Sequence, residues 1–96
     1  MNELTHNLPL STLIRRRRNL LRLKQQQVAD VLRVGPEAVG HWERGKRRIE
    51  LDKLPRLAAV LQLNAQDVCR VALCEFHPAL YLALFGADQP PEPQSI

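Results

Sequence analysis

The sequence has few aromatic residues, no long apolar run and no secretory leader pattern. Only four of its 96 residues are aromatic, so the core must be built chiefly from leucine, valine and alanine. No apolar run approaches the ~20 residues that a membrane-spanning helix needs. Residues 1–10 lack the charged stretch followed by an apolar one that marks a secretory signal. We therefore expect a cytoplasmic protein that makes no contact with a membrane.

Residue types that carry catalysis or bind metals do not cluster in this chain. Cys69 and Cys74 lie five residues apart, a spacing that matches no zinc motif, and we expect both to be buried free thiols. His41 and His77 form no recognisable motif with them, and neither a nucleophile–base pair nor a phosphate-binding loop is present. A domain of this size also leaves little room for a deep cleft. We expect no enzyme activity, no metal site and no cofactor.

Positive charge is concentrated in the N-terminal half. Residues 10–56 carry 13 Lys and Arg against five acids, a surplus of eight, whereas residues 57–96 carry one Arg against four acids, a deficit of three. Glu3 completes the net charge of +4. Such asymmetry is typical of nucleic-acid-binding proteins and, less specifically, of proteins that bind anionic membranes. The alternative interpretation is that these charged residues only form helix faces exposed to solvent.

The spacing of apolar residues predicts an all-α fold. Valine and isoleucine are scattered singly, and no Asn-Gly or Asp-Gly hairpin signal is present. Ser11, Asp52 and Asn64 are N-cap residue types, and Gly45 and Gly86 are typical of positions just beyond a helix. The expected helices cover residues 11–24, 25–32, 36–44, 53–61, 65–75 and 78–85.

The second and third predicted helices, with their short turn, form a helix-turn-helix pattern between a basic helix and a basic loop. Residues 23–47 read LKQQQVADVLRVGPEAVGHWERGKR, and residues 51–68 read LDKLPRLAAVLQLNAQDV. Over about residues 10–71 the chain resembles the lambda-repressor-like, or Cro-like, family. The resemblance implies a compact five-helix DNA-binding domain over residues 10–75, here followed by a sixth helix. The implied function is a sequence-specific transcriptional regulator that binds double-stranded DNA.

The third predicted helix would enter the major groove with its N-terminus first. By position, the resemblance implies that Pro36, Glu37, Gly40 and His41 face the bases. Glu37 would accept a hydrogen bond from cytosine, His41 would donate one to guanine, and Pro36 would touch a thymine methyl group. Gly40 would permit close approach of the helix. Stabilisation of the helix dipole by Glu37 is an equally weighted alternative.

Polar and basic residues around this helix are the candidates for phosphate contacts. The resemblance implies such a role for Gln25, at the start of the second helix, where free backbone N–H groups favour an anion. The other candidates follow the recognition helix or lie on the first helix: Arg44, Lys46, Arg47, Arg15 and Arg16. Exposure to solvent without a DNA contact is the alternative for these cations.

Some positions have structural interpretations, and some depart from the family pattern. The resemblance implies an ion pair between Arg18 and Glu43, which would tie the first helix to the third. Val39 and Trp42 lie three residues apart on the side of the helix expected to face the core. Arg33 replaces the usual turn glycine, so a residue with a side chain is expected to adopt a positive φ.

Further departures concern the first helix and what it faces. Arg17 stands where the family has an apolar residue, and Leu20 and Leu21 stand where it has polar ones. We expect either a rotated first helix or leucines that face another chain.

Residues 76–86 form an apolar segment with two open interpretations. Leu80, Tyr81, Leu84 and Phe85 either complete the core of one chain or form the interface of a homodimer. A homodimer would place two recognition helices ~34 Å apart on an inverted-repeat operator. Residues 1–9 are expected to be a flexible arm and residues 87–96 a disordered tail.

Two functions are therefore compatible with the sequence. The first is a dimeric repressor, encoded by a bacterium or a phage and associated with the nucleoid, that regulates its own or a neighbouring operon. The second is an antitoxin or other protein-binding module that neutralises a toxin or another operon-encoded protein through residues 68–96.

Overall fold

The computed structural model describes residues 9–86, and all of its regular elements are helices. They are α2 (Leu10–Leu20), α3 (Gln25–Leu32), α4 (Pro36–Glu43), the 3-10 helix η1 (Leu51–Lys53), α5 (Leu54–Val60), α6 (Ala65–Phe76) and α7 (Pro78–Phe85). Residues 9–86 contain no strand, so the predicted all-α fold with its additional C-terminal helix is confirmed. Most of the expected N-terminal arm (1–8) and the expected tail (87–96) lie outside the described residues.

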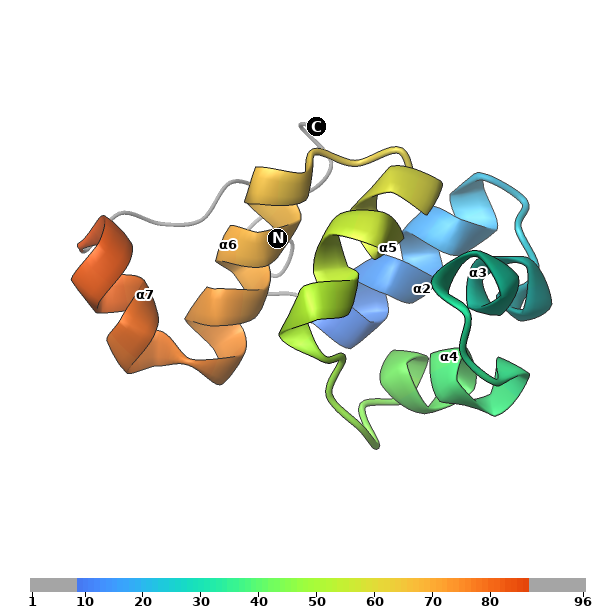
Figure 1. Ribbon diagram of the computed structural model, residues 1–96, viewed down its shortest axis with the longest axis horizontal. Helices are drawn as coiled ribbons and strands as arrows, with labels where there is room; N and C mark the ends of the chain where they lie inside the picture. The colour runs from blue at the N-terminus through green and yellow to red at the C-terminus, as the bar shows by residue number, and fades with distance from the viewer. Residues whose placement is uncertain (1–8, 87–96) are drawn as a thin grey trace, which may run out of the picture.

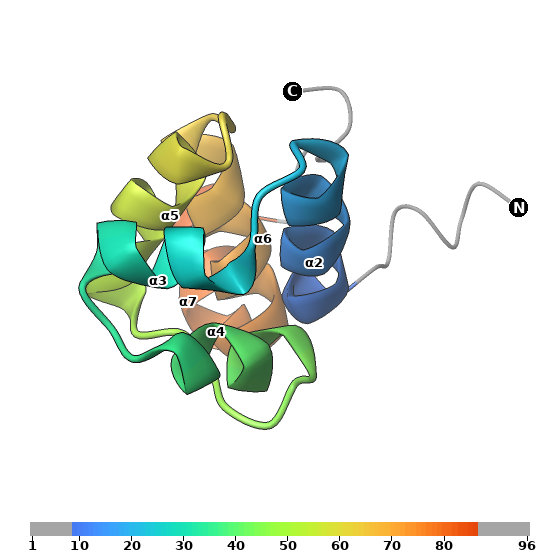
Figure 2. The ribbon, with the colours of Figure 1, turned by 90° about the vertical axis from the view of Figure 1, so that its right-hand side faces the viewer.

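The helices form a long molecule with α3 and α4 at one end and α7 at the other (Figure 1). The longest principal axis measures 36 Å. When the α3–α4 end faces the viewer, α6 and α7 lie behind it (Figure 2). Helix α5 packs against both α3 and α6, and so joins the two ends.

One apolar core holds α2 to α6 together. As expected, Val39 and Trp42 are buried, with 0% and 3% of their surfaces exposed. The remaining members come from α2, α3, α5 with its C-cap, α6 and the loop before η1: Leu10, Ile14, Val28, Ala29, Leu32, Ile49, Leu54, Leu57, Ala58, Leu61, Val68 and Ala72. Small and aliphatic side chains dominate this core, as the scarcity of aromatic residues requires.

Four consecutive helices end in the same hydrogen-bonded turn. After α2, the N–H of Arg22 donates to the oxygen of Asn19 and the N–H of Leu23 donates to the oxygen of Arg18, both at 3.0 Å. This pair of hydrogen bonds defines a Schellman motif, which requires one residue in the left-handed backbone conformation. The same pair of bonds ends α3, α4 and α5. The four left-handed residues are Arg22 (φ 59°), Arg33 (φ 59°), Gly45 (φ 73°) and Gln62 (φ 57°).

Arg33 and Gly45 were expected at such positions, but Arg22 and Gln62 were not. The left-handed conformation of Arg22 ends the first helix at Leu20, so the prediction that it continues to residue 24 was wrong. The other helix limits were predicted to within one residue.

The residues that cap the helix starts were predicted less well than the helix limits. Asn64 caps α6, because its Oδ1 accepts a hydrogen bond from the Asp67 N–H at 3.0 Å, as expected. Ser11 does not cap α2, which begins one residue earlier, and the Leu10 N–H donates to Glu75 Oε1 of α6 at 2.7 Å. Asp52 does not cap α5 either, since it lies within η1. A long-range carboxylate thus replaces the local cap at α2.

Arg17 shows why the first helix departs from the family pattern. Its Nε donates to the oxygen of Leu61 at 2.8 Å, and its Nη2 donates to the oxygen of Gln62 at 3.1 Å. The guanidinium therefore caps the carbonyl groups at the end of α5, where a cation also favours the helix dipole. Leu20, at the end of α2, is 69% exposed.

The two cysteines are free and half-buried, less covered than we expected. Burial raises the pKa of the Cys69 thiol. Among the helices described, none has both the length and the apolar character needed to cross a membrane.

Candidate nucleic-acid interface

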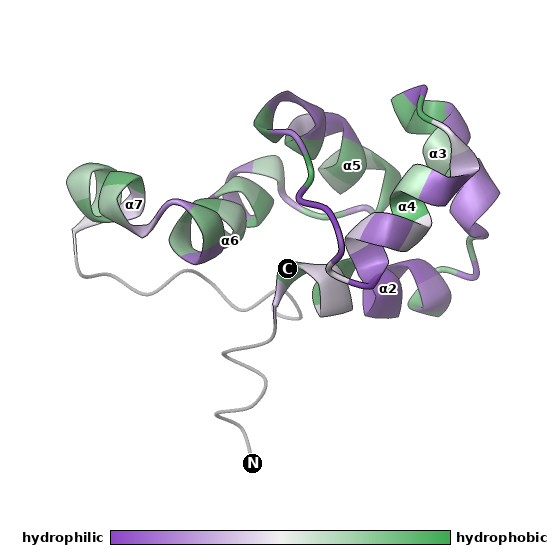
Figure 3. Cartoon of the chain, turned by 90° about the horizontal axis from the view of Figure 1, so that it is seen from below, coloured by the Kyte–Doolittle hydropathy of each residue, from purple (hydrophilic) through white to green (hydrophobic). Residues whose placement is uncertain are grey.

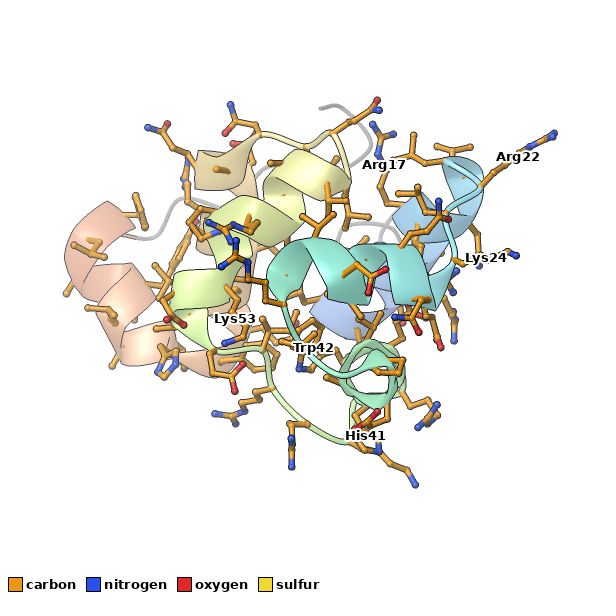
Figure 4. All side chains as sticks on the ribbon, turned by 45° about the vertical axis from the view of Figure 1, so that its right-hand side comes forward. Arg17, Arg22, Lys24, His41, Trp42 and Lys53 are labelled. Atoms are coloured by element: carbon orange, nitrogen blue, oxygen red, sulfur yellow. The ribbon has the colours of Figure 1, made fainter. Side chains whose placement is uncertain are left out.

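Helices α3 and α4 are joined by a turn that fixes their mutual orientation. Arg33, in the left-handed conformation, lets the Val34 N–H donate to the oxygen of Ala29 at 3.0 Å. Pro36 then occupies the first turn of α4, where its missing N–H costs nothing. Because one side of α4 is buried in the core through Val39 and Trp42, its opposite side faces outward. Figure 4 shows Trp42 turned toward the body of the molecule and His41 on the outer side of α4.

A network of three side chains locks α4 against α2 and α3. Arg18 Nε donates to Glu43 Oε2 at 2.6 Å, and Arg18 Nη2 donates to Glu43 Oε1 at 3.0 Å, so the expected ion pair is present and bidentate. Gln25 Nε2 donates to the same Glu43 Oε1 at 3.0 Å. The Glu43 side chain is only 3% exposed. The hydrogen bonds to Glu43 raise the pKa of the Arg18 guanidinium, which stays charged.

The Gln25 amide nitrogen is therefore committed to Glu43, and its oxygen makes no hydrogen bond within residues 9–86. With its nitrogen bound to Glu43, its Oε1 lies toward Gly40, 3.6 Å from where a Cβ on that glycine would be. The same Cβ would lie 3.0 Å from Arg44 Nη1, so the Arg44 side chain folds back over α4. Gly40, expected among the base-reading residues, is buried, and the Gln25 and Arg44 side chains converge over it.

The other expected base-reading residues lie on or near the outer side of α4. Pro36 and Glu37 are exposed, and His41 is half-exposed. The Glu37 carboxylate lies over Gly35, because a Cβ there would be 2.8 Å from Glu37 Oε2. This placement at the start of α4 is the one that the helix-dipole interpretation requires.

A loop of exposed cations follows α4. It comprises Arg44, Lys46, Arg47 and Arg48, held at its start by the Schellman turn at Gly45 and at its end by buried Ile49. Arg48, which was not among the candidates from the sequence, is the one with an aromatic partner: its Cζ lies 4.9 Å from the centre of the Phe76 ring.

The structure separates the two candidate arginines of α2. Both Arg15 and Arg16 are exposed. At 100° per residue, Arg15 lies about 60° around the helix from Arg18, whereas Arg16 lies about 160° from it. Only Arg15 is therefore on the side of α2 that faces α4. Arg22, beyond the end of α2, extends away from the molecule (Figure 4).

The helix-turn-helix family model matches residues 14–68, more than half of the chain. The chain belongs to the lambda-repressor/Cro-like helix-turn-helix family. This family consists of DNA-binding transcriptional regulators, and the matched residues include α3, α4 and the cation loop. Searches of curated proteins and of solved structures gave no match.

Helix α7 lies outside the residues that match the family. It carries no charged residue, and it is apolar all around (Figure 3). Tyr81 is only 4% exposed and its ring lies 5.0 Å from that of half-buried Phe85, so these two expected interface residues pack within the chain. Arg70 of α6 covers them, with its Cζ 4.6 Å from the Phe85 ring centre and its Nη2 3.4 Å from the Tyr81 hydroxyl oxygen.

Leu80, Leu82 and Leu84 of α7 are 45%, 58% and 59% exposed. At 100° per residue, Leu80 and Leu84 lie about 40° apart around the helix and form an exposed leucine surface, whereas Leu82 lies about 160° from both. Leu80 and Leu84 were candidates for a dimer interface, with completion of the core as the alternative, and Leu82 was not among the candidates. The absence of charge from residues 78–85 was the signal that this helix has no polar face.

Among residues 9–86, no group of three or more His, Cys, Asp or Glu side chains could hold a metal ion.

Proposed function

We propose that the protein is a dimeric repressor that reads an inverted-repeat operator through α4. The observation that carries this proposal is the convergence of Gln25 and Arg44 over buried Gly40 of α4, next to the loop of cations. Three partly buried hydrogen bonds to Glu43 hold this surface in place before DNA arrives. Preorganisation of this kind reduces the entropy lost on binding.

The proposed contacts are of two kinds: contacts with phosphates position the protein on DNA, and contacts with base edges specify the sequence. The start of α3 at Gln25, together with Arg44, Lys46, Arg47 and Arg15, would bind phosphates on either side of the groove. Pro36, Glu37 and His41 would face base edges, and Gly40, which is buried beneath Arg44, would allow close approach of the helix. Arg16 points away from this surface and is left out of the proposal.

Dimerisation would use the exposed leucine surface of α7. Because α7 lies at the opposite end of the 36 Å axis from α4, a dimer whose chains extend in opposite directions from a contact at α7 would separate the two α4 helices by more than one turn of DNA, ~34 Å. The next spacing that keeps both half-sites on one face is two turns, ~68 Å. We therefore replace the one-turn spacing expected from the sequence with a two-turn spacing.

Selection of duplexes from a random pool, followed by mobility-shift titration against scrambled competitor at two salt concentrations, tests this function. We expect a recovered inverted repeat that the protein binds in the presence of competitor. Arg47→Ala should weaken binding to specific and scrambled duplexes alike, while Arg56→Ala, an exposed cation of α5, serves as the matched control. If scrambled competitor removed the complex with the selected duplex as readily as the complex with a scrambled duplex, the protein would not be a sequence-specific regulator.

The exposed leucine surface also favours a second candidate function, in which α7 binds an operon-encoded partner protein, as an antitoxin does. A second chain that co-purifies with the wild type and is lost with Leu84→Glu would support this function. Expression together with the neighbouring genes provides the test.

A further inference from the structure

The basic loop after α4 is attached to a distant part of the chain through Arg48. The 4.9 Å between Arg48 Cζ and the Phe76 ring centre is within the ~6 Å at which an aromatic face attracts a guanidinium. Phe76 is the last residue of α6. Figure 1 shows the segment between α4 and α5 and the turn between α6 and α7 on the same lower edge of the molecule.

This contact distinguishes Arg48 from its neighbours. Lys46 and Arg47 are exposed and have no side-chain partner within residues 9–86, so both are free to meet phosphates. Arg48 has one face of its guanidinium against a ring, and the next residue, Ile49, is buried in the core. The three successive cations thus include two that face outward and one that ties the loop down.

We propose that Arg48 is a positioning residue for DNA binding, which acts through the ring of Phe76. By holding the loop against α6, it presents Lys46 and Arg47 in the arrangement that binds DNA. The inference rests on the proposed DNA-binding function. Because an ordered loop loses less conformational entropy on binding, the contact raises affinity without touching a phosphate. The end of α6 then sets DNA affinity although it lies outside the family match.

Phe76→Leu separates this role from a direct phosphate contact, because it removes the ring and no charge. The measurement is fluorescence anisotropy with a labelled mixed-sequence duplex of about 30 base pairs, titrated at several salt concentrations. We expect Phe76→Leu to weaken binding about two- to fivefold, the fold-change that corresponds to an exposed cation–π contact. Its log–log salt slope should match the wild type, whereas Arg47→Ala should lower that slope by about 0.9.

Two further variants test whether Arg48 and Phe76 act together. Phe76→Tyr keeps the ring and should keep wild-type affinity. The double variant Arg48→Ala/Phe76→Leu should bind no more weakly than Arg48→Ala alone. The proposal would be overturned if the double variant lost DNA affinity by the product of the two single losses. It would also be overturned if Phe76→Leu kept wild-type affinity.

Controls for folding and for the proposed function are independent of each other. A double-mutant cycle in urea without DNA should show coupling between Arg48 and Phe76, and purely additive losses would overturn the contact. Circular dichroism identifies a temperature at which every variant is folded, and a loss of DNA affinity that disappears there would also overturn the inference.

If the wild type binds no duplex at low salt, the proposed function itself fails. If the wild type and Phe76→Leu bind equally well, only the inference fails.

Discussion

At the scale of single residues, Gly40 combines a local cost with a gain at the surface. Glycine inside a helix costs about 1 kcal/mol relative to alanine. The Cβ of an alanine would lie 3.0 Å from Arg44 Nη1, the end of a flexible side chain that can move. The residue is therefore suited to let Arg44 lie over α4 next to Gln25.

Gly40→Ala should accordingly stabilise the free protein and weaken its complex with DNA. We expect the free energy of unfolding in urea to rise by about 0.5–1 kcal/mol. DNA affinity should fall, because the new methyl group displaces Arg44. In an Arg44→Ala background the same substitution should cost no further affinity, and a full additional loss there would exclude Arg44 as the cause.

Glu43 is the residue whose loss should damage the fold most directly. Glu43→Gln leaves the Arg18 guanidinium, whose side chain is 12% exposed, without its anionic partner. Breaking a buried ion pair costs about 3–5 kcal/mol, which urea unfolding can measure. Gln25→Ala removes only the third hydrogen bond of the network and should cost about 1 kcal/mol. Equal losses for the two variants would contradict the central place of Glu43.

The pH dependence of this ion pair follows from the raised pKa of Arg18. A cation whose folded pKa is raised stabilises the fold at all pH values below its unfolded pKa. That contribution is lost only as pH rises through the raised value. Arg18 should therefore cause no loss of stability near neutral pH.

At the scale of elements, the helix ends show how far the sequence alone could lead. Asn64 and Gly45 carry their structural roles in their residue type, so the limits they set were predictable. The residue types of Arg22 and Gln62 do not predict their roles, because the surrounding turn imposes the left-handed backbone conformation on these two residues. The half-buried apolar residues that follow them, Leu23 and Leu63, were the available signal, since a Schellman motif places an apolar residue there.

Contacts between distant residues were the part of the site that sequence could not supply. The Arg18–Glu43 pair was accessible through the family resemblance, but the cap of α2 by Glu75 and the Arg48–Phe76 contact depend on how α6 lies against the rest. Local propensity contains no information about these long-range contacts.

Glycine at the strained helix ends should stabilise the protein. A side chain in the left-handed conformation costs about 1–2 kcal/mol, of which the flexibility of an unfolded glycine offsets part. Arg33→Gly and Gln62→Gly should each raise the free energy of unfolding by about 0.5–1 kcal/mol, measured in urea. Gly45→Ala should lower it by a similar amount. A loss of stability in Arg33→Gly would mean that the arginine side chain itself stabilises the turn.

At the scale of the whole molecule, the proposed dimer depends on the exposed leucine surface of α7. Leu84→Glu places a charge on the exposed leucine surface and should convert a dimer into a monomer in sedimentation experiments. Leu20→Glu, at an even more exposed leucine on α2, is the matched control and should leave the dimer intact. The monomeric variant should also lose about half of the salt slope, because it contacts one half-site. An unchanged mass for Leu84→Glu would place the interface elsewhere.

The position of α7 relative to α4 also predicts the spacing of the two half-sites of the operator. Protection of operator DNA from cleavage should show two half-sites whose centres lie about two turns, ~68 Å, apart. Half-sites one turn apart would require a dimer axis much closer to α4 than α7 lies.

The uneven charge along the long axis also affects how the protein finds DNA. Most of the cations lie in α2 and in the loop after α4, whereas α7 carries no charged residue, so the molecule is an electric dipole. In the field of a DNA duplex such a dipole turns during diffusion, and α4 leads at the moment of encounter. Association should therefore be fast at low ionic strength and slow steeply as salt is added, while the leucine surface of α7 trails on the side away from the duplex.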